Sequence, residues 1–184
     1  MTSYFSIKEL YQFKAQNNSI FTLRRCRQKD LKQIYFLELQ IDPENPASEQ
    51  SLKCRLDIFN DGFLIAADQE GKIVGYLHSI LLNDFNFSKF EEISNFFQHF
   101  NYQGDTLYIN FIGVSKEYRR IGIALSLLRY IEKIAKYYKA YKVKLVSKSS
   151  AVNFYKKFGY KIINELPNFL KNNKNSAYLM EKIL

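Results

Sequence analysis

The chain has 184 residues, enough for one well-buried core and too few for two comfortable domains. Hydrophobic residues make up 47% of it and charged residues 24%, which argues against a disordered chain, and no apolar run approaches the length of a membrane helix. The formal net charge of +9 admits an anionic partner, but scattered lysines do not choose between nucleic acid, a membrane surface and a phosphorylated small molecule.

The cysteines and histidines give no pattern of metal or disulfide chemistry. Cys26 and Cys54 are far apart without a CxxC pair, and His78 and His99 lack partners at ligand spacing, so we expect no metal site and no disulfide framework. The start, MTSYFSIKEL, has neither the basic nor the apolar region of a signal peptide. We therefore expect a cytoplasmic protein with no membrane partner.

The first nineteen residues are expected to be an extension, in which IKELYQF can form a helix before a strand at 20–26. Asp30 is then a candidate N-cap for a helix that runs through KDLKQIYFLELQI. The spacing of three and four residues puts one set of side chains on a single face of this helix: Leu31, Ile34, Tyr35, Glu38 and Leu39.

The prolines of DPENP, at 42–46, end that helix, and a second short helix is expected at 47–59. FLIAADQEGKIVGYLHSIL then predicts a hairpin that turns around Glu70 and Gly71. An aromatic-rich insert follows at 83–103, where one face of a short helix is expected to carry Phe90, Ile93, Phe97 and Phe100. This face is expected to cap the core; the alternatives are a lid over a substrate pocket or the contact of a homodimer.

The second half alternates strands and helices. DTLYINFIGV, ending at 114, predicts a strand buried on both faces, and the helix after it has apolar residues at spacings of three and four. A strand at KVKLVS and a helix at SAVNFYKKF follow, and Gly159 is a natural C-cap for that helix. Strands around YKII and SAYLMEKI complete the chain, joined by a lysine- and asparagine-rich loop.

Between the buried strand and the helix stands RRIGIA, at 119–124. A helix start offers unpaired N–H groups and the positive end of the helix dipole, which together favour an anion. Gly122 lets a phosphate approach the backbone, Ala124 keeps the surface low, and Arg119 and Arg120 add charge-assisted hydrogen bonds. The pattern predicts a pyrophosphate site. It is neither a P-loop nor a GxGxxG turn.

The segment VSKEYRRIGIALSLLRYIEKIA resembles the acetyl-CoA-binding motif of the GNAT superfamily of N-acetyltransferases, V-x-x-x-x-[QR]-x-x-G-x-[GA]. Val114, Arg119, Gly122 and Ala124 fill its fixed positions. A second stretch, SSAVNFYKKFGYKI, resembles the family's later motif in these residues: Ala151, Phe154, Tyr155, Gly159 and Tyr160. GDTLYINFIGVSKEYRRIGI is further similar to a bacterial branch with an insert before a YxNxxxV strand.

The resemblance covers about 20–184 and implies one α/β domain of the α+β type. Its central sheet would be mixed, largely antiparallel and splayed, with helices on both sides. The implied function is transfer of the acetyl group of acetyl-CoA to a primary amine, on a small molecule or a protein, by direct attack in a ternary complex. Acetyl-CoA is thus the expected co-substrate, and an amine acceptor the expected partner.

The resemblance also assigns roles to individual residues. Tyr155 takes the position of the general acid that protonates the leaving thiolate, and a backbone N–H near Ile112 would polarise the acetyl carbonyl. Lys148 stands where relatives often have Asn and can meet a phosphate. The implied cofactor-binding set is Ile112, Gly113, Val114, Arg119, Arg120, Ile121, Gly122, Ile123, Ala124, Lys148, Asn153 and Tyr155.

The general base is where the sequence departs from the family pattern. Many relatives carry Glu four residues before the motif valine, whereas this chain has Asn110, which can orient water or substrate but accepts no proton at neutral pH. Asp42, Glu44 and Asp105 are the candidate substitutes, and a water relay is a further alternative. The base stays unassigned.

Asn110 keeps a second function open, a GNAT-like domain that binds acyl-CoA with little or no turnover and acts as a sensor or regulatory module. A third, ranked last, is a basic nucleic-acid-binding module, for which KNNKN and YYKAYKVK come closest to a basic stripe with interleaved aromatic residues.

Overall fold

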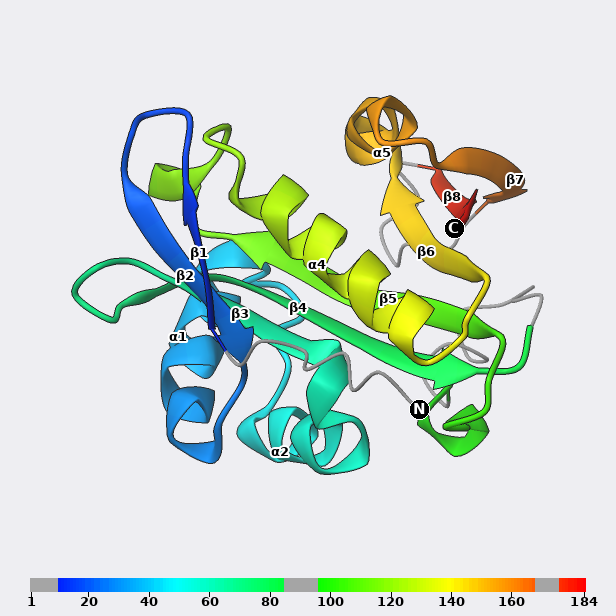
Figure 1. Cartoon of the computed structure of the whole chain (residues 1–184), viewed down its shortest axis with the longest axis horizontal. Helices are drawn as coiled ribbons and strands as arrows, with labels where there is room; N and C mark the ends of the chain where they lie inside the picture. The colour runs from blue at the N-terminus through cyan, green and yellow to red at the C-terminus, as the bar shows by residue number, and fades with distance from the viewer. Residues whose placement is uncertain (1–9, 85–95, 168–175) are drawn as a thin grey trace, which may run out of the picture. The chain divides into compact units, whose positions relative to one another are not determined.

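The computed structural model describes residues 10–84, 96–167 and 176–184. The chain divides into two compact units, and each is described by itself (Figure 1). The first unit consists of Met1–Ser79 and Phe111–Ile134, and the second of Ile80–Asn110 and Ala135–Leu184. No helix in the described ranges is both long and apolar enough to span a bilayer.

In the part of the chain that the structure describes, eight strands form one sheet in the order β1-β2-β3-β4-β5-β6-β8-β7. Their bounds are β1 Leu10–Lys14, β2 Ile20–Arg25, β3 Phe63–Ala67, β4 Ile73–Leu82, β5 Thr106–Val114, β6 Lys142–Lys148, β7 Lys161–Leu166 and β8 Ala177–Ile183. The helices are α1 Leu31–Ile41, α2 Glu49–Ile58, α4 Ile123–Tyr137 and α5 Val152–Lys157.

The sheet is mixed, as expected. The pairs β1–β2, β2–β3, β3–β4, β6–β8 and β7–β8 are antiparallel, while β5 and β6 run parallel, with Thr106–Ile109 opposite Lys142–Leu145. The mixed, largely antiparallel architecture is therefore confirmed. The splay between the central strands remains a prediction.

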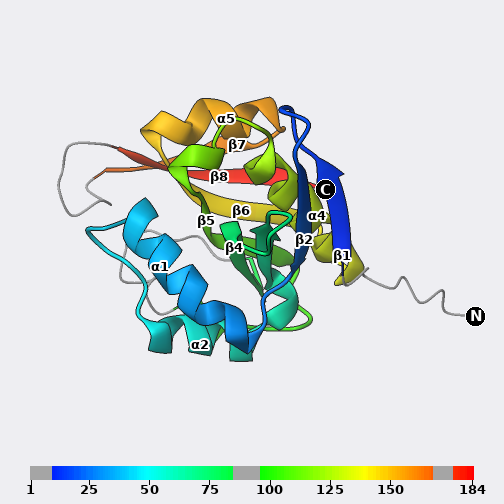
Figure 2. The same cartoon turned by 90° about the vertical axis from the view of Figure 1, so that its left-hand side faces the viewer.

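Within the first unit, β3 shows how the sheet separates two helical layers (Figures 1 and 2). Phe63, Ile65 and Ala67 pack in the core cluster that α1 and α2 complete. Side chains alternate along a strand, so Ala66 faces the other side. Its partner Gly75 lies beside Ile123, because a Cβ added to Gly75 would come within 3.3 Å of Ile123 Cγ2. Hence α4 covers that second face.

The N-terminal extension is a strand where it is described, so the helix expected over IKELYQF is wrong for residues 10–13. Leu10–Lys14 pairs antiparallel with Ile20–Arg25, and residues 15–19 form the turn. The reason is nonlocal. LYQFK gains backbone hydrogen bonds from the edge of β2, which a local helical pattern cannot anticipate.

Asp30 does not cap α1 through its side chain, contrary to the sequence expectation. Its carboxylate instead accepts a hydrogen bond from Arg27 N–H at 2.7 Å and pairs with Arg24, with oxygen to nitrogen distances of 2.5 and 2.9 Å. The neighbouring cation competes for the oxygens that a cap would use. Ser48 is the side-chain cap of α2, accepting from Ser51 N–H at 3.1 Å.

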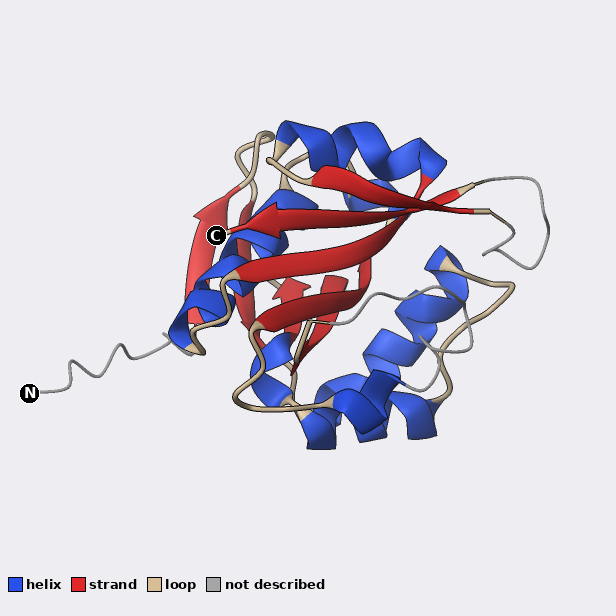
Figure 3. Ribbon diagram, turned by 90° about the vertical axis from the view of Figure 1, so that its right-hand side faces the viewer, coloured by secondary structure: helices blue, strands red, loops and turns tan. Residues whose placement is uncertain are grey.

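The second unit contains β6, β8 and β7 with α5 beside them (Figure 3). The expected strand, helix and strand around KVKLVS, SAVNFYKKF and YKII are confirmed. Gly159, with a φ of 88°, follows α5 in the left-handed conformation that a helix end favours.

The aromatic insert is described only in part. Phe90 and Ile93 lie outside the described residues, while Phe96–His99 forms a 3₁₀ helix and Phe100 bridges to Leu82. The helix expected in this insert thus lies largely outside the described residues, and its roles as core cap, lid or dimer contact remain predictions.

Candidate functional site

The loop between β5 and α4 is anchored on the backbone of both central strands of the first unit. Ser115 N–H donates to the carbonyl of Val74 at 2.8 Å, and Arg119 Nε donates to the carbonyl of Val114 at 3.0 Å. A 3₁₀ turn, Lys116–Tyr118, connects the two anchors. One guanidinium N–H of Arg119 thus holds the loop, and the exposed guanidinium has further N–H groups that can donate to a ligand.

The loop then bends through two left-handed residues. Arg120 has a φ of 63° and Gly122 a φ of 100°, and a Cβ added to Gly122 would meet no atom within 4 Å. Helix α4 begins at once, at Ile123, and its first N–H groups have no partners inside the helix. The open backbone at Gly122, the helix start and two arginines make a pyrophosphate site chemically sound.

Gly113 lies on β5 where two apolar side chains approach the backbone, and its role in cofactor binding remains a prediction. A Cβ there would lie 2.6 Å from the Phe111 ring and 3.0 Å from Ile41 Cδ1, so its side-chain space is already taken. Gly75 has the same restriction, because an added Cβ would lie 3.0 Å from the carbonyl oxygen of Gly113. Ile112 beside it is half-buried. At Gly75 and Gly113 the backbones of the neighbouring strands β4 and β5 therefore lie close together.

Tyr155 lies on α5 in the second unit and is 7% exposed. Its ring packs against Phe154 and Tyr160 at centroid distances of 5.1 and 5.8 Å. Burial raises the pKa of Tyr155 above the usual value for a phenol. The hydroxyl is therefore protonated throughout the neutral range and available as a proton donor. It is also a weaker acid than an exposed tyrosine, so it gives up that proton less readily.

The other expected residues of the second unit are more open. Lys148 ends β6 and is exposed, Asn153 is exposed on α5, and Asn110 is half-buried on β5. Asp105 accepts a hydrogen bond from Thr106 Oγ1 at 2.7 Å. The expected residues from Ile112 to Ala124 thus lie in the first unit. Asp105, Asn110, Lys148, Asn153 and Tyr155 lie in the second.

A buried polar cluster in the first unit was missed by the sequence analysis. Glu38, 1% exposed in its side chain, accepts a hydrogen bond from the hydroxyl of Tyr76 and lies 3.9 Å from Arg55 Nη1. Tyr76 in turn stacks on Phe111, at 4.8 Å and 12° between the planes. The available signal was the carboxylate itself, placed on the apolar face of α1.

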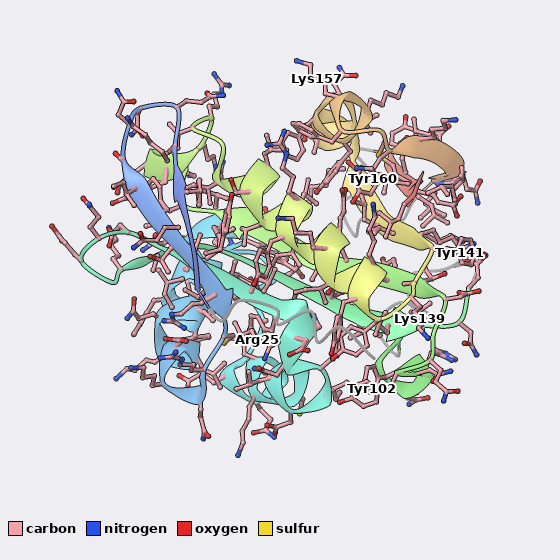
Figure 4. The ribbon with its side chains drawn as sticks, in the orientation of Figure 1. Arg25, Tyr102, Lys139, Tyr141, Lys157 and Tyr160 are labelled. Carbon is pink, nitrogen blue, oxygen red and sulfur yellow. The ribbon has the colours of Figure 1, made fainter. Side chains whose placement is uncertain are left out.

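Two buried lysines in the second unit were missed as well. Lys142 and Lys144 both donate to the carboxylate of Asp84, and each nitrogen lies 3.6 Å from Glu181. They are two of the three lysines in the stretch YYKAYKVK, so most of the charge of that apparent basic stripe is neutralised inside the protein. Of its lysines, Lys139 alone is exposed; it lies with Tyr141 after α4 (Figure 4).

Comparison with known proteins finds relatives in sequence and in fold. An N-alpha-acetyltransferase of Sulfurisphaera tokodaii is 29% identical over 171 residues, covering 91% of this chain and 95% of the relative. The loading GNATL domain of CurA from Lyngbya majuscula superposes with a TM-score of 0.76 at 17% identity, over 89% of this chain and 97% of that one. Arabidopsis thaliana Naa50, solved with the bisubstrate analogue CoA-Ac-MVNAL, gives 0.70 at 21%, over 89% and 99%. The structural likenesses show the fold.

The family match and the N-alpha-acetyltransferase relative identify an acyltransferase of the N-acetyltransferase type. Residues 23–160 match the Acetyltransferase (GNAT) family, and the chain belongs to that family.

Proposed function

We propose that this protein transfers the acetyl group of acetyl-CoA to the α-amino group of a polypeptide N-terminus. The proposal that acetyl-CoA is bound rests on the loop from Arg119 to Ala124, which has a left-handed glycine with open space around it at a helix start. The proposal that the acceptor is an α-amino group is supported by the similarity to an N-alpha-acetyltransferase along nearly the whole chain. A neighbour solved with a peptide-like bisubstrate analogue points the same way.

In this proposal the diphosphate of acetyl-CoA binds the N–H groups at the start of α4, between the guanidinium groups of Arg119 and Arg120. The pantetheine arm lies along β5 and pairs with backbone groups of Ile112 and Val114. Lys148 meets a phosphate, and Asn153 contacts the cofactor from α5. Backbone contacts suit this ligand because its amides alternate donors and acceptors as a strand does.

The reaction is a direct displacement. The neutral amine attacks the thioester carbonyl carbon, the new C–N bond forms and the C–S bond breaks. The N–H of Ile112 stabilises the developing oxyanion, an interaction worth about 3 kcal/mol in comparable sites. Tyr155 gives its proton to the departing thiolate, and the amine loses its own proton to Asp42, Glu44, Asp105 or a water held by Asn110.

The cellular setting we propose is the cytoplasm. Both cysteines are free thiols, Cys26 buried and Cys54 exposed, as a reducing compartment allows.

Asn110, in place of an acidic residue on the central strand, supports one competing function: an acyl-CoA sensor with little turnover. A thiol-release assay with acetyl-CoA separates the two. We expect release with a lysine-free peptide that has a free N-terminus. We expect none with the same peptide N-acetylated and given one lysine, and little with small amines. Coenzyme A binding without release from any acceptor would favour the sensor, and release only from lysine or small amines would overturn the N-terminal acceptor.

A further inference from the structure

The β1–β2 hairpin belongs to the first unit, and the proposed reaction assigns it no task. Its turn, residues 15–19, is well ordered by hydrogen bonds: Ala15 N–H donates to the Ser19 carbonyl at 2.8 Å, and Asn18 N–H to the Ala15 carbonyl at 3.0 Å. Ala15 is buried at 6% exposure. In Figures 1 and 2 the turn reaches the loop that precedes α4.

A backbone hydrogen bond joins the turn to that loop. Gln16 N–H donates to the carbonyl of Ile121 at 3.1 Å. Ile121 stands between the two left-handed residues, Arg120 and Gly122, at the centre of the proposed diphosphate site.

This hydrogen bond fixes the direction of a donor. In a trans peptide the C=O of one residue and the N–H of the next point in opposite directions, and the described chain contains no cis peptide. When the Ile121 carbonyl faces Gln16, the Gly122 N–H must therefore face away from the hairpin. The hairpin thus sets the orientation of the amide that an anion at this site would need.

A second contact supports the loop on the other side of the arginine pair. Phe21 of β2, only 2% exposed, stacks on Phe13 of β1 at 5.7 Å and meets the edge of Tyr118 at 6.0 Å and 87°. Tyr118 is the last residue of the 3₁₀ turn before Arg119. The hairpin therefore holds the loop at Tyr118 and at Ile121, one residue before the arginines and one residue after them.

Holding is needed because the loop backbone is strained. A non-glycine residue in the left-handed region, such as Arg120 with its φ of 63°, is disfavoured and persists only where its surroundings impose it. A loop that must first adopt this shape binds its ligand more weakly than one already in it.

We propose that the N-terminal hairpin is a built-in positioning element for the coenzyme A diphosphate, acting through Gln16 N–H on Ile121 and through Phe21 on Tyr118. The inference rests on the proposed function of the loop. It makes Gln16 a positioning residue for the cofactor and gives it no part in acceptor binding.

The turn offers a sharp test at one position. Gln16 is the second residue of the β-turn closed by Asn18 N–H and the Ala15 carbonyl, a position that favours proline. Gln16→Pro therefore keeps the turn and removes the N–H, while Gln16→Ala keeps the N–H and removes only the side chain. We expect Gln16→Pro to raise the Kd for coenzyme A and the KM for acetyl-CoA about fivefold, as for the loss of one hydrogen bond. The acceptor KM should stay unchanged, and Gln16→Ala should behave as wild type.

A second pair of variants covers the case in which Gln16→Pro fails to fold. Tyr118→Leu removes the ring that Phe21 contacts and should weaken coenzyme A binding in the same selective way. Tyr11→Leu is its control, because Tyr11 lies on the same hairpin but contacts Tyr130 of α4, with ring centroids 6.1 Å apart.

Calorimetry with coenzyme A on the wild-type chain and the variants tests the proposed function separately from the role of the hairpin. No binding to wild type would overturn the proposed function and this inference together. Tight binding to wild type, with equal affinity in Gln16→Pro and Gln16→Ala, would overturn the inference alone. So would equal affinities in Tyr118→Leu and Tyr11→Leu, or a change of acceptor KM as large as that of acetyl-CoA.

Discussion

Tyr76 on β4 donates its hydroxyl hydrogen to the carboxylate of Glu38 on α1, and both side chains are buried in the first unit. Burial raises the pKa of Glu38 above its usual range, and this effect exceeds the opposing hydrogen bond from Tyr76 and the charge of Arg55. A carboxylate therefore occupies a position on the α1 face that aliphatic residues otherwise fill. Its protonation is linked to the stability of the fold.

The first prediction concerns that linkage. A raised pKa means that the folded chain binds the Glu38 proton more tightly than the unfolded chain does, so the group stabilises most at low pH. Its contribution to the free energy of unfolding should fall as pH rises from the usual Glu pKa through the folded one, and then level off. Glu38→Gln should remove this fall.

Urea unfolding of wild type and Glu38→Gln over a series of pH values measures the effect. The carboxyls of Asp30 and Asp84, whose pKa values are lowered and whose contributions are lost on acidification, are common to both proteins and cancel in the difference. A difference that does not change with pH would contradict the assignment.

The second prediction concerns the buried lysines of the second unit. Lys144 is 2% exposed in its side chain and Lys142 7%, so Asp84→Asn leaves two buried cations with Glu181 as their remaining anion. Breaking a fully buried pair costs about 3–5 kcal/mol. Since Asp84 itself is 37% exposed, we expect a loss of about 2 kcal/mol in urea unfolding.

Glu117→Gln is the matched control for Asp84→Asn. It breaks the exposed pair with Lys72, which has a nitrogen to oxygen distance of 3.8 Å, and should cost less than about 1 kcal/mol. Equal losses in the two variants would show that the buried cluster is no more stabilising than a surface pair.

The third prediction isolates the role of the loop glycine. Gly122 and Gly71 both have positive φ, 100° and 83°, and at neither would an added Cβ meet an atom within 4 Å. Alanine at either position should therefore cost about 1 kcal/mol of stability through the same backbone strain. Only Gly122→Ala should weaken coenzyme A binding, about tenfold or more, because Gly71 lies in the β3–β4 turn. If calorimetry gave comparable coenzyme A affinities for Gly122→Ala and Gly71→Ala, Gly122 would have no part in cofactor binding.

The fourth prediction tests the proton donor. Tyr155→Phe removes one hydroxyl from a buried ring and should lower kcat about 100-fold or more, with little change in the KM for acetyl-CoA. Tyr160→Phe, in the neighbouring ring at 5.8 Å, is the control and should keep kcat near wild type. A thiol-release assay measures both. An unchanged kcat in Tyr155→Phe would exclude it as the acid.

The elements that sequence alone predicts here are those whose determinants are local. A buried run followed by charge, glycine and an amphipathic stretch is enough to place β5, the loop and α4, and Gly159 marks the end of α5. Contacts between residues far apart in the sequence were not predicted. Tyr76 and Glu38 are 38 positions apart, and Lys144 and Asp84 are 60 apart.

The errors have a different cause, because the partners involved are close in sequence. Asp30 reads as a helix cap, but Arg24 on β2 takes its carboxylate. The stretch before Lys14 reads as a helix, but pairing with β2 makes it a strand. In both cases a partner from another element decides, and a single sequence does not reveal that partner.

The most direct test of the central claim compares coenzyme A with pantetheine, which lacks the diphosphate and the adenosine 3′-phosphate attached to it, in calorimetric titrations of the whole chain, with adenosine 3′-phosphate titrated alone as the control. If the segment from Arg119 to Ala124 binds the diphosphate, coenzyme A binds at a single site and pantetheine binds at least about 100-fold more weakly. Equal affinity for the two ligands, or no heat with coenzyme A, would contradict the account.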